Sequence, residues 1–291
     1  MQYEQHMRDM GYAEISQRNN VLRLQRFFPQ DLPIGRITSE RARAYYEAFR
    51  RRRRPDGQPI SVDYHRGTLG YAKSFLGWAV EQGWLQANPL ANVKGIGKLS
   101  AGKRQHTGDE ARRFFGHCLA RAEEGDESAL GILLTLLLAL RNSDVCRRLV
   151  RDVDLDGTQL IVAKAKTPKS NRPRRIPVVL QPLMRRLVQG RDPFEPLFFA
   201  SHTEDGHHTI DWLRKAMHRH CEAAGVPYIC PHALKGTAGS VLAEMGELAD
   251  RIADHLSHES SATTRRHYIA PGAIEGAVAE RALKVITGGR G

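Results

Sequence analysis

The sequence contains little cysteine, and its cysteines do not form the patterns of a disulfide framework or a metal motif. Its four cysteines are Cys118, Cys146, Cys221 and Cys230, and no two of them form a CxxC pair. We therefore expect reduced thiols without a disulfide framework. Histidines and cysteines recur within residues 218–232, but an i, i+2 spacing on a helix points to opposite sides, which does not suit zinc. We expect neither a metal nor a cofactor.

The sequence also lacks a long hydrophobic run. The longest apolar stretch, residues 129–140, is interrupted by Gly131 and Thr135 and is shorter than the roughly 20 residues that span a bilayer. It predicts a buried helix. The first residues lack the apolar core of a signal peptide, so we expect a cytoplasmic chain with no membrane partner.

Acidic residues are outnumbered by basic ones, and the imbalance is concentrated in the first third of the chain. The sequence has 44 Lys and Arg against 32 Asp and Glu, a net charge of +12. Residues 1–105 hold 18 basic and 9 acidic residues, which gives this segment a net +9. Such a surplus attracts a polyanion, because each neutralised phosphate releases condensed counterions. Nucleic acid or an anionic membrane surface would satisfy it.

The spacing of apolar residues predicts two domains. Residues 14–28, 39–53 and 61–82 have helical patterns separated by loops rich in proline and charge. We expect a helical bundle over residues 1–94. Residues 95–107, with three Gly, two Lys and one Arg, are typical of an exposed linker. The second domain should then span residues 108–291.

The second domain has the pattern of an α+β fold dominated by helices. A helix over residues 108–121 precedes the apolar helix, which ends near Arg141. β-branched residues predict two strands, at 159–163 and 175–179, joined by a basic hairpin tip at residues 164–174. Further helices are expected at residues 180–188, 209–224, 232–245, 247–256 and 273–285. The predicted fold class is mainly α, with a small antiparallel sheet in the second domain.

Several residues with side chains suited to phosphate chemistry follow one another in a specific order. Arg141 ends the apolar helix, and Lys235 follows His232 by three positions, on the same face of a helix that Pro231 can begin. His258 and Tyr268 lie ten residues apart near the C-terminus. The predicted hairpin tip places a lysine between Arg141 and His232 in the sequence. This order of residues resembles the tyrosine recombinases, a family that includes phage, Xer and transposon integrases. The family motifs are a helix-ending arginine, a hairpin lysine, H-x-x-R, a G-H pair and a tyrosine.

The resemblance implies a role for each matching residue in DNA cleavage. Tyr268 would attack a phosphodiester and form a 3′-phosphotyrosyl intermediate, which conserves the bond energy for rejoining. Arg141, Lys235 and His258 would donate to the non-bridging oxygens, where charge grows in the transition state. His232 would take the proton of the tyrosine, and the hairpin lysine would protonate the departing 5′-oxygen. Cationic side chains thus take the place of a metal.

Three features depart from the family pattern. Lys235 replaces the second arginine, Ser257 replaces the glycine before His258, and the hairpin is longer than usual. Lysine is a point charge, whereas arginine binds phosphate with two parallel donors, so we expect altered phosphate geometry. The hairpin lysine is either Lys166, in a K-T-P-K turn, or Lys169, by counting back from the next strand. We favour Lys166.

The resemblance also implies partners. We expect double-stranded DNA with a specific site, a tetramer held by a C-terminal helix from about residue 273, possible accessory proteins, and no arm-binding domain. A bacterial or phage origin and a place at the nucleoid would follow. A run of arginines is often only a solvated surface, but in this context we predict phosphate contacts. The predicted DNA-binding residues are Arg50, Arg51, Arg52, Arg53, Arg54, Lys73 and Lys169. Two alternatives stay open: a DNA-binding protein that has lost catalysis, and an enzyme similar to type IB topoisomerases.

Overall fold

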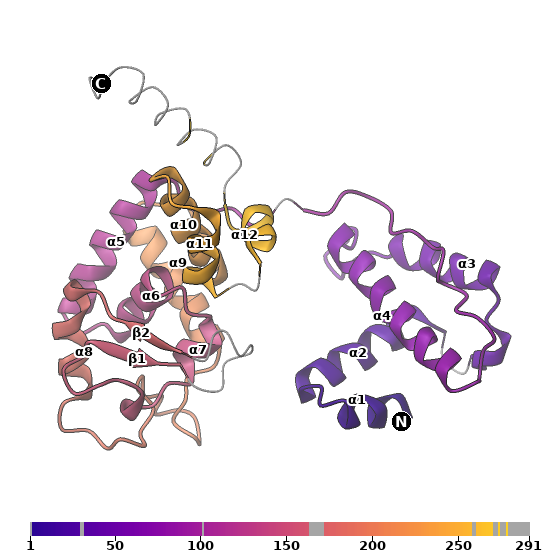
Figure 1. Ribbon diagram of the computed structural model, residues 1–291, viewed down its shortest axis with the longest axis horizontal. Helices are drawn as coiled ribbons and strands as arrows, with labels where there is room; N and C mark the ends of the chain where they lie inside the picture. The colour runs from indigo at the N-terminus through magenta and orange to yellow at the C-terminus, as the bar shows by residue number, and fades with distance from the viewer. Residues whose placement is uncertain are drawn as a thin grey trace. The chain divides into compact units, whose positions relative to one another are not determined.

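The chain forms two compact units, residues 1–100 and 101–291 (Figure 1). The computed structural model describes residues 2–29, 32–100, 102–162, 172–257, 260–269, 273 and 278. Within these residues the chain is mainly helical with one two-stranded antiparallel sheet, which confirms the predicted fold class. No helix in the described part is long and apolar enough to cross a membrane.

The first unit is a helical bundle around an aromatic core. Its helices are α1 (Gln2–Asp9), α2 (Glu14–Phe27), α3 (Ser39–Arg50) and α4 (Val62–Glu81). The Thr38 side chain accepts from the backbone N–H of Arg41 and so caps α3, and Ser61 caps α4 in the same way. Tyr46 and Phe49 of α3 are almost fully buried against α2 and α4. Helix α1 was not expected from the sequence.

Helix α3 ends three residues earlier than predicted, and the run of arginines therefore leaves the helix. The backbone N–H of Ile60 donates to the carbonyl of Arg52 at 3.1 Å, and that of Arg54 donates to Gln58 at 2.7 Å. These bonds form a tight turn with Gly57 at φ +78°. The arginines after Arg50 consequently lie on a loop with exposed side chains.

In the described residues of the second unit, a buried helix lies among several others. The helices are α5 (Gly108–Glu123), α6 (Glu127–Leu137), α7 (Asn142–Cys146), α8 (Gln181–Val188), α9 (Asp211–Ala223), α10 (Pro231–Glu244), α11 (Ala249–Leu256) and α12 (Ser261–His267). Helix α6 is buried along almost its whole length and lies among α5, α7, α9 and α10. This agrees with its apolar sequence. The short helices α7 and α12 were not expected.

The sheet corrects the predicted second strand. Strand β1 (Gln159–Ile161) pairs with β2 (Pro173–Arg175), and Leu160 lies opposite Arg174. The prediction of a strand at residues 175–179 was wrong, because Pro177 has no N–H for the ladder and the next three residues form a 3-10 helix. Because side chains alternate along a strand, Arg174, opposite the buried Leu160, faces inward between the exposed Pro173 and Arg175.

Two predicted features lie outside the described residues. The hairpin tip is described only up to residue 162 and again from residue 172, so Lys166 and Lys169 fall between. Of the predicted last helix at 273–285, only Ala273 and Val278 are described.

Candidate active site

The centre of the candidate site is a hydrogen bond between Tyr268 and His232. Helix α10 begins at Pro231, whose fixed φ suits the first helical position, and His232 follows it. Tyr268 comes directly after α12, and its backbone N–H donates to Thr264 at 2.9 Å. The His232 Nε2 and the Tyr268 Oη lie 2.8 Å apart. Two residues 36 positions apart in the sequence thus form the pair that proton transfer from the phenol requires.

The backbone of Tyr268 lies unusually close to helix α10. A Cβ atom added at Gly239 would lie 2.7 Å from the Tyr268 carbonyl oxygen and 3.2 Å from the Leu256 Cδ1. Only glycine permits this approach. Gly239 therefore helps to set the position of the tyrosine relative to His232 on the same helix.

Arg141 lies at the junction between α6 and α7. The chain reaches it through Ala139, which has a left-handed φ of 51°, a conformation that costs a non-glycine residue about 1–2 kcal/mol. The Arg141 backbone N–H donates to Asp144 Oδ2 at 3.2 Å, and its Nη1 lies 3.8 Å from the same oxygen. Asp144 thus fixes the backbone and the guanidinium of the half-buried arginine.

The site carries more positive charge than its surroundings neutralise. Burial, followed by repulsion from Arg141 and Arg174, lowers the pKa of Lys235 to about 7, although Asp144 acts in the opposite direction. Burial and the cationic groups of Lys235, Lys103 and Arg141 lower the pKa of His232 to about 4. Such mutual repulsion would be relieved by a bound anion.

Burial also affects the tyrosine itself. It raises the pKa of the Tyr268 phenol, and the charge of Arg141 partly offsets that rise. In the free protein the phenol therefore keeps its proton and the imidazole of His232 is neutral at pH 7. This is the protonation state in which the imidazole can accept the phenolic proton.

Lys235 differs from a solvent-facing phosphate ligand. Its side chain is almost completely buried, with the residue 1% exposed, and its Nζ donates to the Leu256 carbonyl at 2.9 Å. The structure thus brings Arg141, His232, Lys235 and Tyr268 into one region of the second unit. Lys166 and His258, the other predicted catalytic residues, lie outside the described part of the chain.

Two functional candidates were not predicted from the sequence. Arg174 lies in strand β2, just before the predicted start of that strand, and Lys103 lies in the segment predicted to be a linker. Arg174 is buried beside Lys235 and bonds to the end of α11. Lys103 adds positive charge near His232. An alternation pattern begun at Pro173 instead of Arg175 would have pointed to Arg174.

The predicted DNA-binding residues of the first unit have varied surroundings. Arg50 is tied to Glu47, with 2.7 Å between Nε and Oε2. The Arg51 and Arg54 side chains are 74% and 55% exposed, whereas Arg52 stacks over the Phe49 ring at 5.2 Å. The other two predicted residues donate to backbone carbonyls, Arg53 to Gly57 at 2.8 Å and Lys73 to Ala91 at 2.9 Å. Arg51 lies 3.9 Å from Glu47 and Arg54 lies 3.3 Å from Asp56. Both side chains nevertheless stay more than half exposed, which makes them the most accessible cations of this set.

The residues that might suggest zinc are engaged otherwise. The His220 ring lies 3.1 Å from the His117 Nε2 and 3.1 Å from the Ser128 hydroxyl. In the part of the chain that the structure describes, no three His, Cys, Asp or Glu residues are grouped as metal ligands.

The chain is similar to known proteins of one family. Residues 104–273 match the model of the phage integrase family. Tyrosine recombinase XerC of Mycobacterium bovis is 32% identical over 231 residues, covering 72% of this chain and 73% of the relative. XerC of Corynebacterium efficiens is 25% identical, covering 72% and 69%.

Solved structures show the same fold. The Tn1549 transposon integrase in complex with a circular intermediate DNA has a TM-score of 0.72 and 17% identity, covering 97% of both chains. A lambda integrase dimer bound to a COC′ core site has a TM-score of 0.64 and 16% identity, covering 90% of this chain and 94% of that one.

Proposed function

The chain belongs to the phage integrase family, and we propose that it is a site-specific DNA recombinase that cleaves and rejoins strands through a 3′-phosphotyrosyl intermediate. The observation that carries this proposal is the hydrogen bond between His232 and Tyr268. It places a neutral base on the hydroxyl of a half-buried tyrosine, beside several cations.

The cleavage step uses these groups as follows. The Tyr268 Oη forms a bond to phosphorus while the bond to the 5′-oxygen breaks, and the phenolic proton passes to the His232 Nε2. The departing 5′-oxygen takes a proton from the hairpin lysine, for which Lys166 is our choice. The reverse steps rejoin the strand, so no external energy source is needed.

The positive charge of the site stabilises the phosphate in this reaction. Arg141 donates to its non-bridging oxygens, with His258 as a second donor and Lys235 adding charge from behind. Removing one such donor typically costs about 10²- to 10³-fold in rate. The phosphate also offsets the repulsion that lowers the pKa of His232, and so makes the imidazole a stronger base once DNA is bound.

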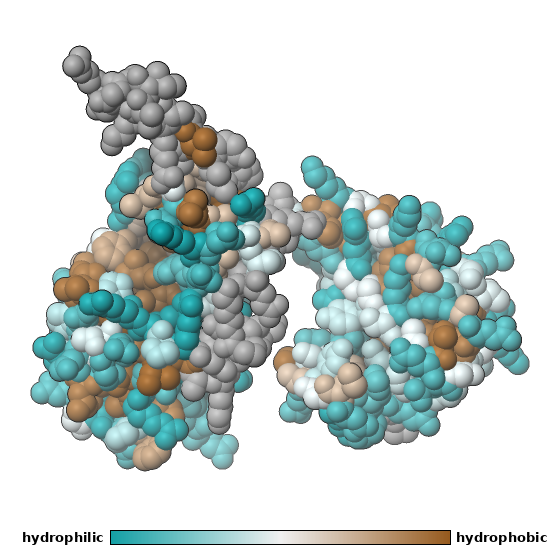
Figure 2. All heavy atoms as spheres, in the orientation of Figure 1, coloured by the Kyte–Doolittle hydropathy of each residue, from teal (hydrophilic) through white to brown (hydrophobic). Residues whose placement is uncertain are grey.

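A groove on the second unit supports self-association. It has a volume of about 600 Å³ and is lined mainly by apolar residues of α5, α6, α10 and α11, among them Ala111, Phe115 and Val241. Hydrophobic side chains gather in this region of the surface (Figure 2). We propose that the C-terminal segment of a neighbouring subunit docks here when a tetramer forms on two DNA sites.

A covalent-adduct assay tests the function. Duplex oligonucleotides tile the DNA that flanks the gene, and each carries a nick, so that the short strand released by cleavage diffuses away. We expect a denaturation-resistant adduct on one site, abolished by Tyr268→Phe. Adducts on every duplex, independent of sequence and synapsis, would indicate a topoisomerase-like enzyme instead.

The second candidate function is DNA binding without cleavage, which the contact between Lys235 and the Leu256 carbonyl favours. The Lys235 ammonium donates to a backbone carbonyl, whereas the arginine that the family motif has at this position is expected to bind phosphate. A duplex that the chain binds in a gel-shift assay, with no adduct at any nick position, would support this alternative.

A further inference from the structure

The C-terminal end of α11 is held by three cations from two other segments. Arg172, which directly precedes β2, donates to the Asp254 carbonyl, and the Nη1 of Arg174 in β2 donates to the His255 carbonyl at 3.0 Å. From α10, the Lys235 Nζ donates to Leu256 at 2.9 Å. The last carbonyls of a helix lack partners within it and carry partial negative charge, so cations suit this position.

The residue that follows α11 has a backbone conformation that normally requires glycine. Ser257 has φ 55° and ψ 43°, in the left-handed region, and it is 3% exposed. This explains the glycine of the family motif, because glycine adopts the conformation without strain. In this chain the serine hydroxyl offers an acceptor that glycine lacks, and the Arg174 Nη2 donates to it.

We propose that Arg174 is a positioning residue for DNA cleavage, which holds Ser257, the residue that precedes His258 in the sequence, in its left-handed turn at the end of α11. The inference rests on the proposed recombinase function. Serine in place of glycine creates a strained turn, and the buried guanidinium offsets the strain by bonding both the turn and the helix end.

The surroundings of Arg174 argue against direct contact with DNA. The residue is 8% exposed, and both terminal nitrogens of its guanidinium are used by acceptors of the protein. It remains charged at neutral pH, since burial and nearby Arg172 lower its pKa only to about 10. It therefore acts on the turn rather than on a phosphate.

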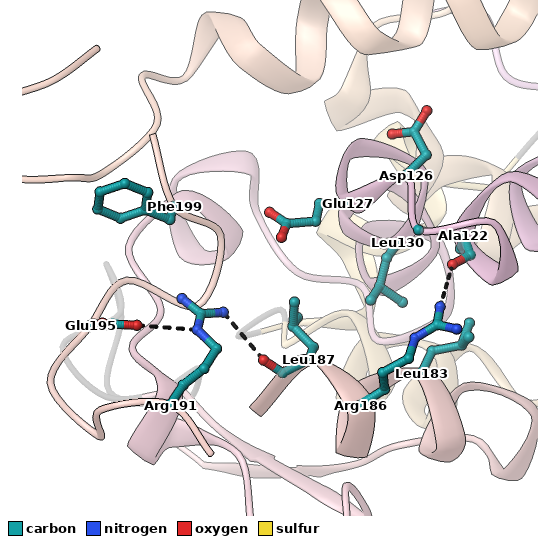
Figure 3. Close-up of a pocket in the computed structure, with 11 residues that line it drawn as sticks. Ala122, Asp126, Glu127, Leu130, Leu183, Arg186, Leu187, Arg191, Glu195 and Phe199 are labelled. Carbon is teal, nitrogen blue, oxygen red and sulfur yellow. Dashed lines mark hydrogen bonds and ion pairs between the residues drawn. The ribbon is translucent and has the colours of Figure 1, made fainter. Parts of the chain in front are cut away.

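Arg186 provides a matched control for helix capping alone. Its Nη2 donates to the Ala122 carbonyl at 3.0 Å, a bond drawn in Figure 3. It also donates to the Glu123 carbonyl at 3.1 Å, so it caps the last carbonyls of α5. The cavity beside it, about 470 Å³ in volume, shares no lining residue with the candidate active site. Arg186→Gln should lower thermal stability and leave the rate of adduct formation per folded molecule unchanged.

The test combines hydrogen exchange with single-turnover adduct formation on the nicked duplex. Arg174→Gln should speed exchange of backbone amides in residues 253–257 and slow adduct formation about 10- to 100-fold, the cost of a displacement near 1 Å at a reacting group. Ser257→Gly in the Arg174→Gln background should restore most of the rate, because glycine needs no support in this turn. Ser257→Ala, which removes only the hydroxyl, should slow adduct formation in the same direction.

The outcomes separate this inference from the function on which it rests. A wild-type chain that forms no adduct refutes the recombinase, and with it any role of Arg174 in cleavage. If the wild-type chain forms adduct normally, but adding Ser257→Gly to Arg174→Gln does not restore the rate, the positioning role alone is refuted. Unchanged exchange at residues 253–257 in Arg174→Gln also refutes it. Should that variant fail to fold, an unchanged rate for Ser257→Ala is decisive.

Discussion

Replacing Gly239 by alanine should displace the nucleophile without touching any reacting atom. The added Cβ would lie 2.7 Å from the Tyr268 carbonyl oxygen, whereas carbon–oxygen contacts in proteins settle at about 3.3–3.6 Å. One of the two backbones must therefore move by about 0.6–0.9 Å. A shift of this size at a reacting group costs up to about 100-fold in rate.

The stability of the variant should fall by less than its activity. Overpacking a core position typically costs about 1–3 kcal/mol, and alanine returns part of this through its better helix propensity. The measurement is single-turnover adduct formation on the nicked duplex, normalised to the folded fraction from thermal melting. We expect a loss of about 10- to 100-fold in a protein that remains folded at the assay temperature.

Gly116 of α5 is the matched control. A Cβ at Gly116 would meet nothing within 4 Å, so Gly116→Ala should stabilise the chain slightly and leave cleavage unchanged. If Gly239→Ala formed adduct at the wild-type rate, the contact between α10 and the tyrosine backbone would not position the nucleophile.

Three further predictions follow from the charges and the groove. At limiting DNA concentration, where the rate reports the pKa values of the free protein, adduct formation should fall below about pH 4, as His232 gains its proton, and above about pH 7, as Lys235 loses its own. Lys235→Arg should remove the alkaline limb, because arginine stays charged. Replacing Arg51 and Arg54 by glutamine should flatten the plot of log affinity for DNA against log salt by about 0.9 per lost phosphate contact. Ala111→Glu should reduce complexes of more than one subunit on DNA, as measured by mass photometry, while a single bound subunit still forms adduct.

The pH dependence of folding provides a check on Lys235. The free energy of unfolding should rise between about pH 7 and the ordinary lysine pKa of 10.5, because in this range the unfolded chain keeps the proton that the buried Lys235 has lost. Activity and stability therefore change in opposite directions above pH 7, and a parallel change would exclude Lys235 as the titrating group. An unchanged salt slope would place Arg51 and Arg54 away from DNA. Normal assembly of Ala111→Glu would exclude the groove as the docking site.

The sequence predicts the elements of this fold better than the side chains that face inward from them. The periodicity of apolar residues located most helices, because one apolar face must be buried whatever it packs against. The short helices α7 and α12 have too few residues to show a period. The order of Arg141, His232 and Tyr268 predicted a candidate site, since each residue type suits one step of the chemistry, and the structure brings these residues into one region.

The sequence could not predict contacts that depend on the register of the two strands or on the backbone carbonyls of another helix. The predicted strand began at Arg175 and so left out Arg174, whose inward position follows from its burial and its pairing with Leu160. The motif predicted that the Lys235 ammonium binds phosphate, whereas its described partner is the carbonyl of Leu256. Neither contact is visible in the spacing of apolar residues.

The pairing of His232 and Tyr268 within one chain bears on how mixed assemblies behave. Under the proposed mechanism, the base His232 and the nucleophile Tyr268 come from the same polypeptide, so a subunit would not borrow either from its neighbour. Diluting wild-type chains with Tyr268→Phe chains should therefore reduce initial adduct formation in direct proportion to the wild-type fraction. Complete strand exchange in the proposed tetramer would need several competent subunits, so it should decline more steeply, and the difference between the two curves would count the subunits that act together.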